Sequence, residues 1–442
     1  IVNEIIIDAV KRNASDIHFD PTKENLRLRI RVDGELSDYG VIEKKYQKNI
    51  ISRIKMIAGM NIMETRLPQD GAIKDKIGDN VLDLRVSSLP TNNGEKVVIR
   101  ILDYSQSLKG LETLGFSQKS LEKIYKIISV PNGIILVTGA TGTGKSTTVY
   151  SILQKLNTEN VNIITVEDPI EMDIKGINQV QVMSEIGLTF DNVLRSILRQ
   201  DPNIVMIGEI RDSETARMAV RASITGHLVL STIHTNNSLN TIERLTDMEI
   251  ERYLLGSALT GIISQRLARK ICPKCAIKKP TNEYEKSIFK KVLGLDINEM
   301  YHPNPDGCPE CSHGYKGRVA ILEVLRITEE IKDAIVNSTP KSELRKLVYN
   351  GDVITLLQDG LEKVVEGTTS FEEILKIIDL DNDLTSYEDF NLRTNIDASV
   401  IKKDESNSNI DKNIEPSIEN NDLNPEQNVE TPTETNNSVD QN

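Results

Sequence analysis

Residues 139–146 have the composition and spacing of a phosphate-binding loop. They read Gly-Ala-Thr-Gly-Thr-Gly-Lys-Ser and fit the pattern G-x-x-x-x-G-K-[ST]. Glycines let backbone N–H groups curl around phosphates, where a Cβ would obstruct them. In such loops the lysine reaches the β- and γ-phosphates, and the hydroxyl that follows binds Mg²⁺. The pattern therefore predicts a site for Mg-ATP, with Lys145 as a catalytic group and Ser146 as the magnesium ligand.

The surroundings of this loop favour nucleotide binding over a simple glycine-rich turn. The apolar run 134–137 predicts a strand buried on both faces, and a helix is expected over 145–156. The helix would add the positive end of its dipole to the site. The predicted nucleotide-binding residues are Gly139, Ala140, Thr141, Gly142, Thr143, Gly144, Lys145, Ser146 and Thr147.

Acidic residues follow two further apolar runs. The run 204–207 leads through Gly208 to Glu209, which we expect to orient or deprotonate the attacking water. Glu167 and Glu171 flank Asp168 after the run 163–166. Three carboxylates so close together repel one another unless a cation or donors lie among them. We expect an outer magnesium and water shell here, and a solvated loop is the alternative.

Two histidines bracket the predicted strand 228–233. Because side chains alternate along a strand, His227 and His234 point to opposite faces and cannot both serve one site. His234 follows the strand, where it could sense the γ-phosphate. We expect His227 to be structural.

Four cysteines form two CxxC pairs separated by 32 residues. Four thiolates in two such pairs suit tetrahedral Zn²⁺ with a structural role, since no coordination position remains for water. A redox dithiol and an iron–sulfur centre are the alternatives. The predicted zinc ligands are Cys272, Cys275, Cys308 and Cys311.

Composition and charge divide the 442 residues into segments. Hydrophobic residues make up 38% and charged residues 27%, as in globular proteins, and neither a membrane-spanning run nor a secretory signal is visible. The chain begins at Ile1, so we expect an upstream region to be missing. Residues 379–442 contain 16 acidic and 4 basic residues, which account for nearly all of the net charge of -13. We expect this tail to be disordered.

The pattern of strands and helices predicts an α/β protein. Alternating short strands, with helices over 4–12 and 46–58, indicate a small α+β domain over 1–102. A linker is expected over 103–116, and a βαβ rhythm over 117–270 implies a mostly parallel sheet. Residues 271–378 carry the cysteines and then helices, for example over 341–349 and 371–378.

Together these motifs closely resemble the secretion superfamily ATPases, specifically the extension ATPases of type IV pili and their type II secretion counterparts. The resemblance covers roughly residues 3–378. The segments that carry it, besides the phosphate-binding loop and the cysteines, are 14–18, 31–34, 67–71, 85–91, 165–171, 198–212 and 225–236.

The resemblance implies more than the motifs do. It implies a PAS-like first domain, a RecA-like ATPase domain with a zinc insertion, and Arg85 and Arg100 reaching the nucleotide in a closed state. It makes Glu209 the catalytic acid. It further implies a homohexamer at the inner face of the cytoplasmic membrane that associates with the membrane through partners. There the ring would drive a platform protein in pilus assembly.

Other functions remain open from the sequence. A type II secretion or DNA-uptake ATPase is the alternative within the same class. A nucleic-acid translocase is a distant alternative, suggested by basic residues within 266–279. Aromatic residues are only 4% and Trp is absent, so stacking platforms are scarce and no nucleic acid is expected. A regulatory nucleotide switch is disfavoured by Glu209.

Overall fold

The computed structural model describes residues 1–77, 80–103, 110–349 and 353–378. The predicted tail over 379–442, and residues 104–109 of the predicted linker, lie outside the described residues. Within the described part, no helix combines the length and the apolar character that crossing a bilayer requires.

The first domain is built on a six-stranded sheet with the order β3-β2-β1-β6-β5-β4. Period-two alternation explains its strands: in β2, Leu26, Leu28 and Ile30 are buried while arginines alternate with them. Helices α1 and α2 contribute to the same core as these strands. The elements are α1 (Val2–Lys11), β1 (Ala14–Pro21), β2 (Asn25–Val32), β3 (Glu35–Glu43), α2 (Gln47–Ile57), β4 (Gln69–Ile77), β5 (Asn80–Thr91) and β6 (Gly94–Asp103).

A second sheet of seven strands has the order β15-β12-β7-β11-β10-β8-β9. Neighbouring strands from β12 to β9 are parallel, and β15 pairs antiparallel with β12 at the edge. The chain is thus an α/β protein, as predicted. The strands are β7 (Gly133–Thr138), β8 (Ile163–Glu167), β9 (Asn178–Gln181), β10 (Ile204–Ile207), β11 (Leu228–Ile233), β12 (Leu259–Ile271) and β15 (Tyr315–Arg326).

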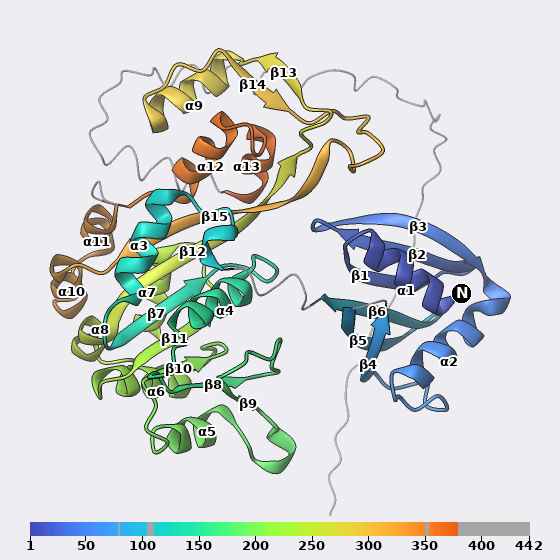
Figure 1. Ribbon diagram of the computed structural model, residues 1–442, viewed down its shortest axis with the longest axis horizontal. Coiled ribbons are helices and arrows are strands. Elements are labelled where there is room, and N and C mark those ends of the chain that lie inside the picture. Colours follow the sequence, from blue (N-terminus) through green and yellow to red (C-terminus); the bar gives the residue numbers. More distant parts are fainter. Residues whose placement is uncertain (78–79, 104–109, 350–352, 379–442) are drawn as a thin grey trace, which may run out of the picture. The chain divides into compact units, whose positions relative to one another are not determined.

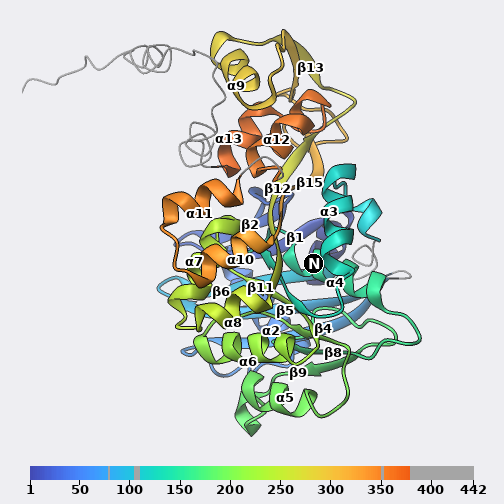
Figure 2. The same cartoon turned by 90° about the vertical axis from the view of Figure 1, so that its left-hand side faces the viewer.

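Helices cover both faces of this sheet (Figures 1 and 2). In β7, Ile135 and Val137 pack with α3 and α4, whereas Ile134 and Leu136 pack with the helices of the opposite face. This two-sided burial is the reason that the strands are continuous apolar runs. The helices are α3 (Gln118–Ile128), α4 (Lys145–Leu156), α5 (Phe190–Ile197), α6 (Ser213–Ile224), α7 (Ser238–Asp247), α8 (Arg252–Ala258), α10 (Glu329–Val336) and α11 (Lys341–Val348).

The strands β12 and β15 extend beyond the sheet into a cysteine-containing region (Figure 1). A separate apolar core there includes Phe289, Phe371 and Met300. The remaining elements are the hairpin strands β13 (Ile277–Pro280) and β14 (Glu299–His302), with α9 (Glu283–Leu293), α12 (Leu356–Val365) and α13 (Phe371–Ile377).

The structure differs from two expected boundaries. Residues 315–326 were expected within the cysteine-containing segment, yet they form β15 of the main sheet, because pairing with β12 joins residues distant in the sequence. The expected linker also contributes to a core, since Leu111 and Phe116 are buried with α3 and α4. Local composition does not report such packing.

Candidate nucleotide-binding site

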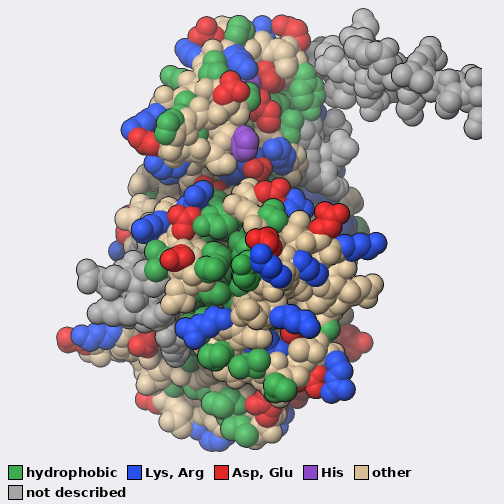
Figure 3. Space-filling view, turned by 90° about the vertical axis from the view of Figure 1, so that its right-hand side faces the viewer, with side chains coloured by type: hydrophobic (Ala, Val, Ile, Leu, Met, Phe, Trp, Pro, Cys, Tyr) green, Lys and Arg blue, Asp and Glu red, His purple; other side chains and the backbone are tan. Residues whose placement is uncertain are grey.

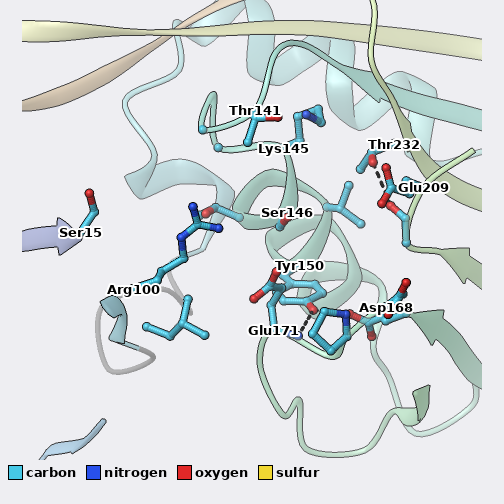
Figure 4. A pocket seen from close by; sticks show the side chains of 18 of the residues that line it. Ser15, Arg100, Thr141, Lys145, Ser146, Tyr150, Asp168, Glu171, Glu209 and Thr232 are labelled. Atoms are coloured by element: carbon cyan, nitrogen blue, oxygen red, sulfur yellow. Dashed lines mark hydrogen bonds between the residues drawn. The ribbon is translucent and has the colours of Figure 1, made fainter. Parts of the chain in front are cut away.

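The carboxyl ends of four parallel strands meet at one edge of the second sheet. The loop after β7 lies there beside the residues that follow β8, β10 and β11. Ligands of open α/β sheets bind at this edge. One pocket is lined by Lys145, Ser146 and Glu209, which Figure 4 labels, and also by Glu167 and His234. The tertiary structure therefore brings together residues that the sequence separates by almost 90 positions.

Two glycines of the loop occupy positions that other residues would not fit. Gly139 has a φ of 152°, and a Cβ there would lie 2.5 Å from the carbonyl oxygen of Gln265. Gly144 has a φ of 85°, and its Cβ would lie 2.8 Å from Nε2 of Gln265. Both conformations favour glycine. Close approach of β12 thus requires glycine at both ends of the loop.

Lys145 begins α4 and turns back toward the loop. Its Nζ donates hydrogen bonds to the carbonyl oxygens of Gly139, at 2.9 Å, and of Ala140, at 3.0 Å. Burial lowers the pKa of Lys145, although Glu209 acts in the opposite direction. The ammonium group is therefore held inside the loop, where phosphate oxygens would replace the two carbonyl groups.

The residues present fit a bound Mg-ATP. Ser146 is exposed, lines the pocket and stands in the first turn of α4, where backbone N–H groups and the helix dipole favour anions. Thr141 and Gly142 are also exposed and line the same pocket. Lys145 and Ser146 would hold the phosphates and the magnesium ion.

Gln265 on β12 holds the loop from behind, a contact that sequence reasoning missed. Its Nε2 donates to the carbonyl of Thr143 at 2.7 Å, and its Oε1 accepts from the hydroxyl of Thr148 at 2.7 Å. The side chain is 2% exposed. A single glutamine in a long strand carries no local signal, because its partners lie about 120 positions earlier in the chain.

Glu209 lies between the guanidinium group of Arg211 and the imidazole ring of His234. One carboxylate oxygen pairs with Arg211, and the other lies 3.5 Å from Nε2 of His234. The hydrogen bond that Arg211 donates to Glu209 raises the pKa of Arg211, so this guanidinium stays charged. The carboxylate thereby faces the pocket from the end of β10, and Thr232 anchors the preceding carbonyl of Gly208 at 2.8 Å (Figure 4).

Glu167 lines the pocket, and its side chain is buried and hydrogen-bonded within the protein. It is 3% exposed, and its carboxylate accepts hydrogen bonds from Tyr150, Thr165 (2.6 Å) and Gln179 (3.0 Å). Glu167 is the last residue of β8 and directly follows the predicted apolar run 163–166, but the sequence did not indicate that its side chain would be buried. Of the three neighbouring acids, Asp168 is exposed and Glu171 is partly exposed. Donors from the protein thus surround the carboxylate of Glu167.

Two arginines of the first domain also line the pocket. Arg85 forms an ion pair of 3.0 Å with Glu171 and lies 3.4 Å from the carbonyl of Ile170. Arg100 pairs instead with Asp16 at 3.1 Å, within the first domain. His227 is not among the pocket residues, and its Nδ1 lies 2.8 Å from the carbonyl of Ala222.

The four cysteines form a cluster away from this pocket. Their sulfur atoms all lie within 4.8 Å of one another, with separations of 3.8, 3.6 and 3.5 Å between hydrogen-bonded pairs. Sulfurs bound tetrahedrally to zinc at about 2.3 Å would be about 3.8 Å apart. Burial opposes ionisation of Cys272, but nearby backbone N–H groups and thiols lower its pKa to about 7, whereas burial and the neighbouring thiols raise the pKa of Cys275. The donor set therefore fits a closed zinc site.

A parallel sheet covered by helices, with a phosphate-binding loop and a carboxylate at its carboxyl edge, defines a P-loop ATPase. The family described as "Type II/IV secretion system protein" matches residues 1–376. The chain belongs to this family of secretion ATPases and hydrolyses ATP.

Individual proteins of known type are similar to this chain in sequence and structure. Type II secretion system protein E of Pectobacterium carotovorum subsp. carotovorum is 43% identical over 378 residues, which cover 85% of this chain and 75% of the relative. The type IV pilus assembly ATPase PilB of Acinetobacter baylyi is 41% identical over 382 residues, covering 85% and 65%. The solved structure of the pilus retraction motor PilT with bound ADP has a TM-score of 0.59 and 25% identity, covering 87% of this chain and 98% of that one.

Proposed function

We propose that this ATPase powers a type II secretion machine, by driving the assembly of its pseudopilus. The observation that carries the proposal is the 43% identity to type II secretion system protein E over 85% of the chain. Type II secretion has at least as much support from the relatives as type IV pilus assembly, which the resemblance implied.

Type IV pilus assembly remains the second candidate. The similarity to PilB of Acinetobacter baylyi is 41% over the same share of the chain, so identity alone separates the two machines poorly. Both candidates use the same site for ATP and differ in the filament that is built.

Within the site, we assign a task to each group. Lys145 leaves the loop carbonyls to neutralise phosphate charge, and the Ser146 hydroxyl holds magnesium, which would supply charge neutralisation when bound. Glu209 orients or deprotonates the attacking water, while His234 beside it senses the γ-phosphate. Arg85 and Arg100 add positive charge when the first domain closes.

The proposed motor works as a homohexamer bound to a platform protein of the cytoplasmic membrane. ATP hydrolysis would change the position of the first domain. Hydrolysis by one subunit after another around the ring would move the platform protein. Association with the membrane would run through that partner.

The charge pattern of the chain disfavours the nucleic-acid translocase. Of the basic residues within 266–279, Arg269 is buried against Glu373, and Lys274 and Lys278 pair with Glu310 and Glu299. On the face shown in Figure 3, Lys and Arg side chains are interspersed with Asp and Glu. Among the described residues on that face, the basic side chains do not form the continuous surface that binding to a nucleic-acid backbone requires.

The first test measures steady-state ATPase activity against protein concentration, with Lys145→Ala and Glu209→Gln alongside. We expect specific activity to rise as the ring assembles, and each variant to lose roughly 100-fold or more in kcat. Near-normal turnover by Lys145→Ala would refute the proposed site. Activity independent of concentration would refute a catalytic ring.

The second test separates the two machines in the host. Deleting the gene should abolish export of secreted proteins and leave surface pili intact, and the wild-type chain, but not Lys145→Ala, should restore export. Loss of pili with normal export would reverse the assignment to pilus assembly.

A further inference from the structure

The hydroxyl group of Tyr150 bridges two acidic residues at the edge of the nucleotide site. It donates to one carboxylate oxygen of Glu167 and accepts the backbone N–H of Glu171 at 3.1 Å. Tyr150 is 2% exposed, and Figure 4 shows it between Ser146 and Glu171. Both the donor and the acceptor capacity of this hydroxyl are therefore used inside the protein.

The position of Tyr150 ties the acidic segment to the helix that carries the phosphate-binding residues. It lies in α4 four residues after Ser146, so the two side chains stand on the same face of the helix. The segment 167–171 follows β8, a different strand. A buried hydrogen bond from α4 is thus a direct link between the magnesium side of the site and Glu171.

We propose that Tyr150 is a positioning residue for ATP hydrolysis: its hydroxyl fixes the segment 167–171 so that Glu171 faces the magnesium side of the pocket. Glu167 serves as the buried anchor of this link rather than as a group of the water shell. The inference rests on the proposed ATPase site and on a place for Glu171 in the outer magnesium and water shell that the sequence predicts, and the Glu171→Gln variant tests that role by itself.

The chemistry of the link favours a lasting restraint. Burial and the adjacent Glu167 raise the pKa of Tyr150, so the phenol keeps the proton that it donates. Thr165 and Gln179 donate to the other oxygen of Glu167, so three donors fix the orientation of this carboxylate. Tyr150→Phe would keep the ring packing and remove one partner from each end of the link, the Oε2 of Glu167 and the backbone N–H of Glu171.

Hydrogen exchange of the nucleotide-free protein tests the link without measuring activity. The Tyr150→Phe variant should exchange the Glu171 amide about tenfold faster than the wild type, because that N–H loses its acceptor. The matched control is Tyr315→Phe, which removes another buried tyrosine hydroxyl, bonded to Ser370 at 2.8 Å. Equal exchange at Glu171 in the wild type and the Tyr150→Phe variant would overturn the proposal.

Kinetics then test whether the link acts through Glu171. Tyr150→Phe should lower kcat about tenfold, with KM for ATP within about twofold, since a small misplacement costs rate more than binding. In the Glu171→Gln background the same substitution should add no further loss. A full tenfold loss in that background would refute the inference. Normal kcat in Glu171→Gln alone would refute the role of Glu171 and leave the exchange result standing.

A second variant covers the case in which Tyr150→Phe unfolds the domain. Thr165→Val removes a different donor to Glu167, at 2.6 Å, and keeps the side-chain shape. It should produce the same kcat loss, smaller in size, and the same non-additivity with Glu171→Gln. Unchanged kcat in folded Thr165→Val would contradict the anchoring role of Glu167.

Discussion

At the residue scale, Gln265 shows how a strand without chemistry of its own supports the site. It joins β12 to the phosphate-binding loop and to α4 through its two amide atoms. The loop therefore keeps its shape before nucleotide arrives, which reduces the ordering cost of binding.

We predict that Gln265→Ala raises the KM for ATP about tenfold and lowers the free energy of unfolding by about 1–3 kcal/mol, because two buried groups lose their partner. Nucleotide titration and urea unfolding measure the two effects. The control is Gln47→Ala, a buried glutamine of the first domain that bonds to Asn93. It should lower stability alone. A normal KM in Gln265→Ala would show that the phosphate-binding loop keeps its conformation without the contact to Gln265.

At the element scale, the ion pairs of Asp20 connect three strands of the first domain. It lies in β1 and pairs with Lys96 of β6 and with Arg29 of β2, the latter at 2.6 Å. Burial alone would raise the pKa of Asp20, but these two partners outweigh it and hold the pKa below its ordinary value of 3.8.

A lowered folded-state pKa means that the stabilisation is complete above the unfolded value and disappears as the pH falls through the folded value. Asp20→Asn should therefore lower the free energy of unfolding by about 1–3 kcal/mol at pH 7 and change little in strong acid. Urea unfolding across pH measures this. Asp38→Asn, whose partner Arg27 is exposed, should have a much smaller effect at pH 7. A pH-independent difference would exclude the carboxylate as the cause.

The two cysteine-bearing turns form a second local unit. We predict one zinc per chain by elemental analysis, and a lower melting temperature of the cysteine-containing region after chelation, because the fold of such sites is coupled to the metal. ATP binding should persist, since the phosphate-binding loop is remote from the cysteines. Purified protein without zinc, together with an intact fold when all four cysteines are Ser, would exclude the structural site.

At the scale of the whole molecule, catalysis is expected to depend on arginines of the first domain. Arg85 pairs with Glu171 and Arg100 with Asp16, so each has a partner that it would have to leave. Exchange of these partners for phosphate oxygens would couple the chemical step to movement of the first domain.

We predict that Arg85→Ala and Arg100→Ala each lower kcat roughly 100-fold and leave ATP affinity within about threefold, since guanidinium groups act on charge that develops in the transition state. Turnover and binding of a non-hydrolysable analogue separate the two effects. Arg27→Ala, another first-domain arginine paired on the surface, is the control. Loss of affinity equal to the loss of kcat would instead indicate ground-state binding.

Local sequence was enough for the elements closest to the chemistry. The helix predicted over 145–156 is α4 with the same bounds, and the strand predicted over 204–207 is β10. These predictions succeed because glycine positions and hydrophobic periodicity act between neighbours in the chain.

Only the tertiary structure placed β15 beside β12, buried Glu167 under Tyr150 and set Gln265 behind the loop. Each of these contacts joins residues that lie between 17 and about 120 positions apart, and each depends on side-chain packing. The sequence by itself thus predicted the phosphate-binding loop and the cluster of four cysteines, and the structure brings those cysteines together. The fold decided which carboxylate meets solvent and which is held, because burial and hydrogen bonding are properties of the assembled chain.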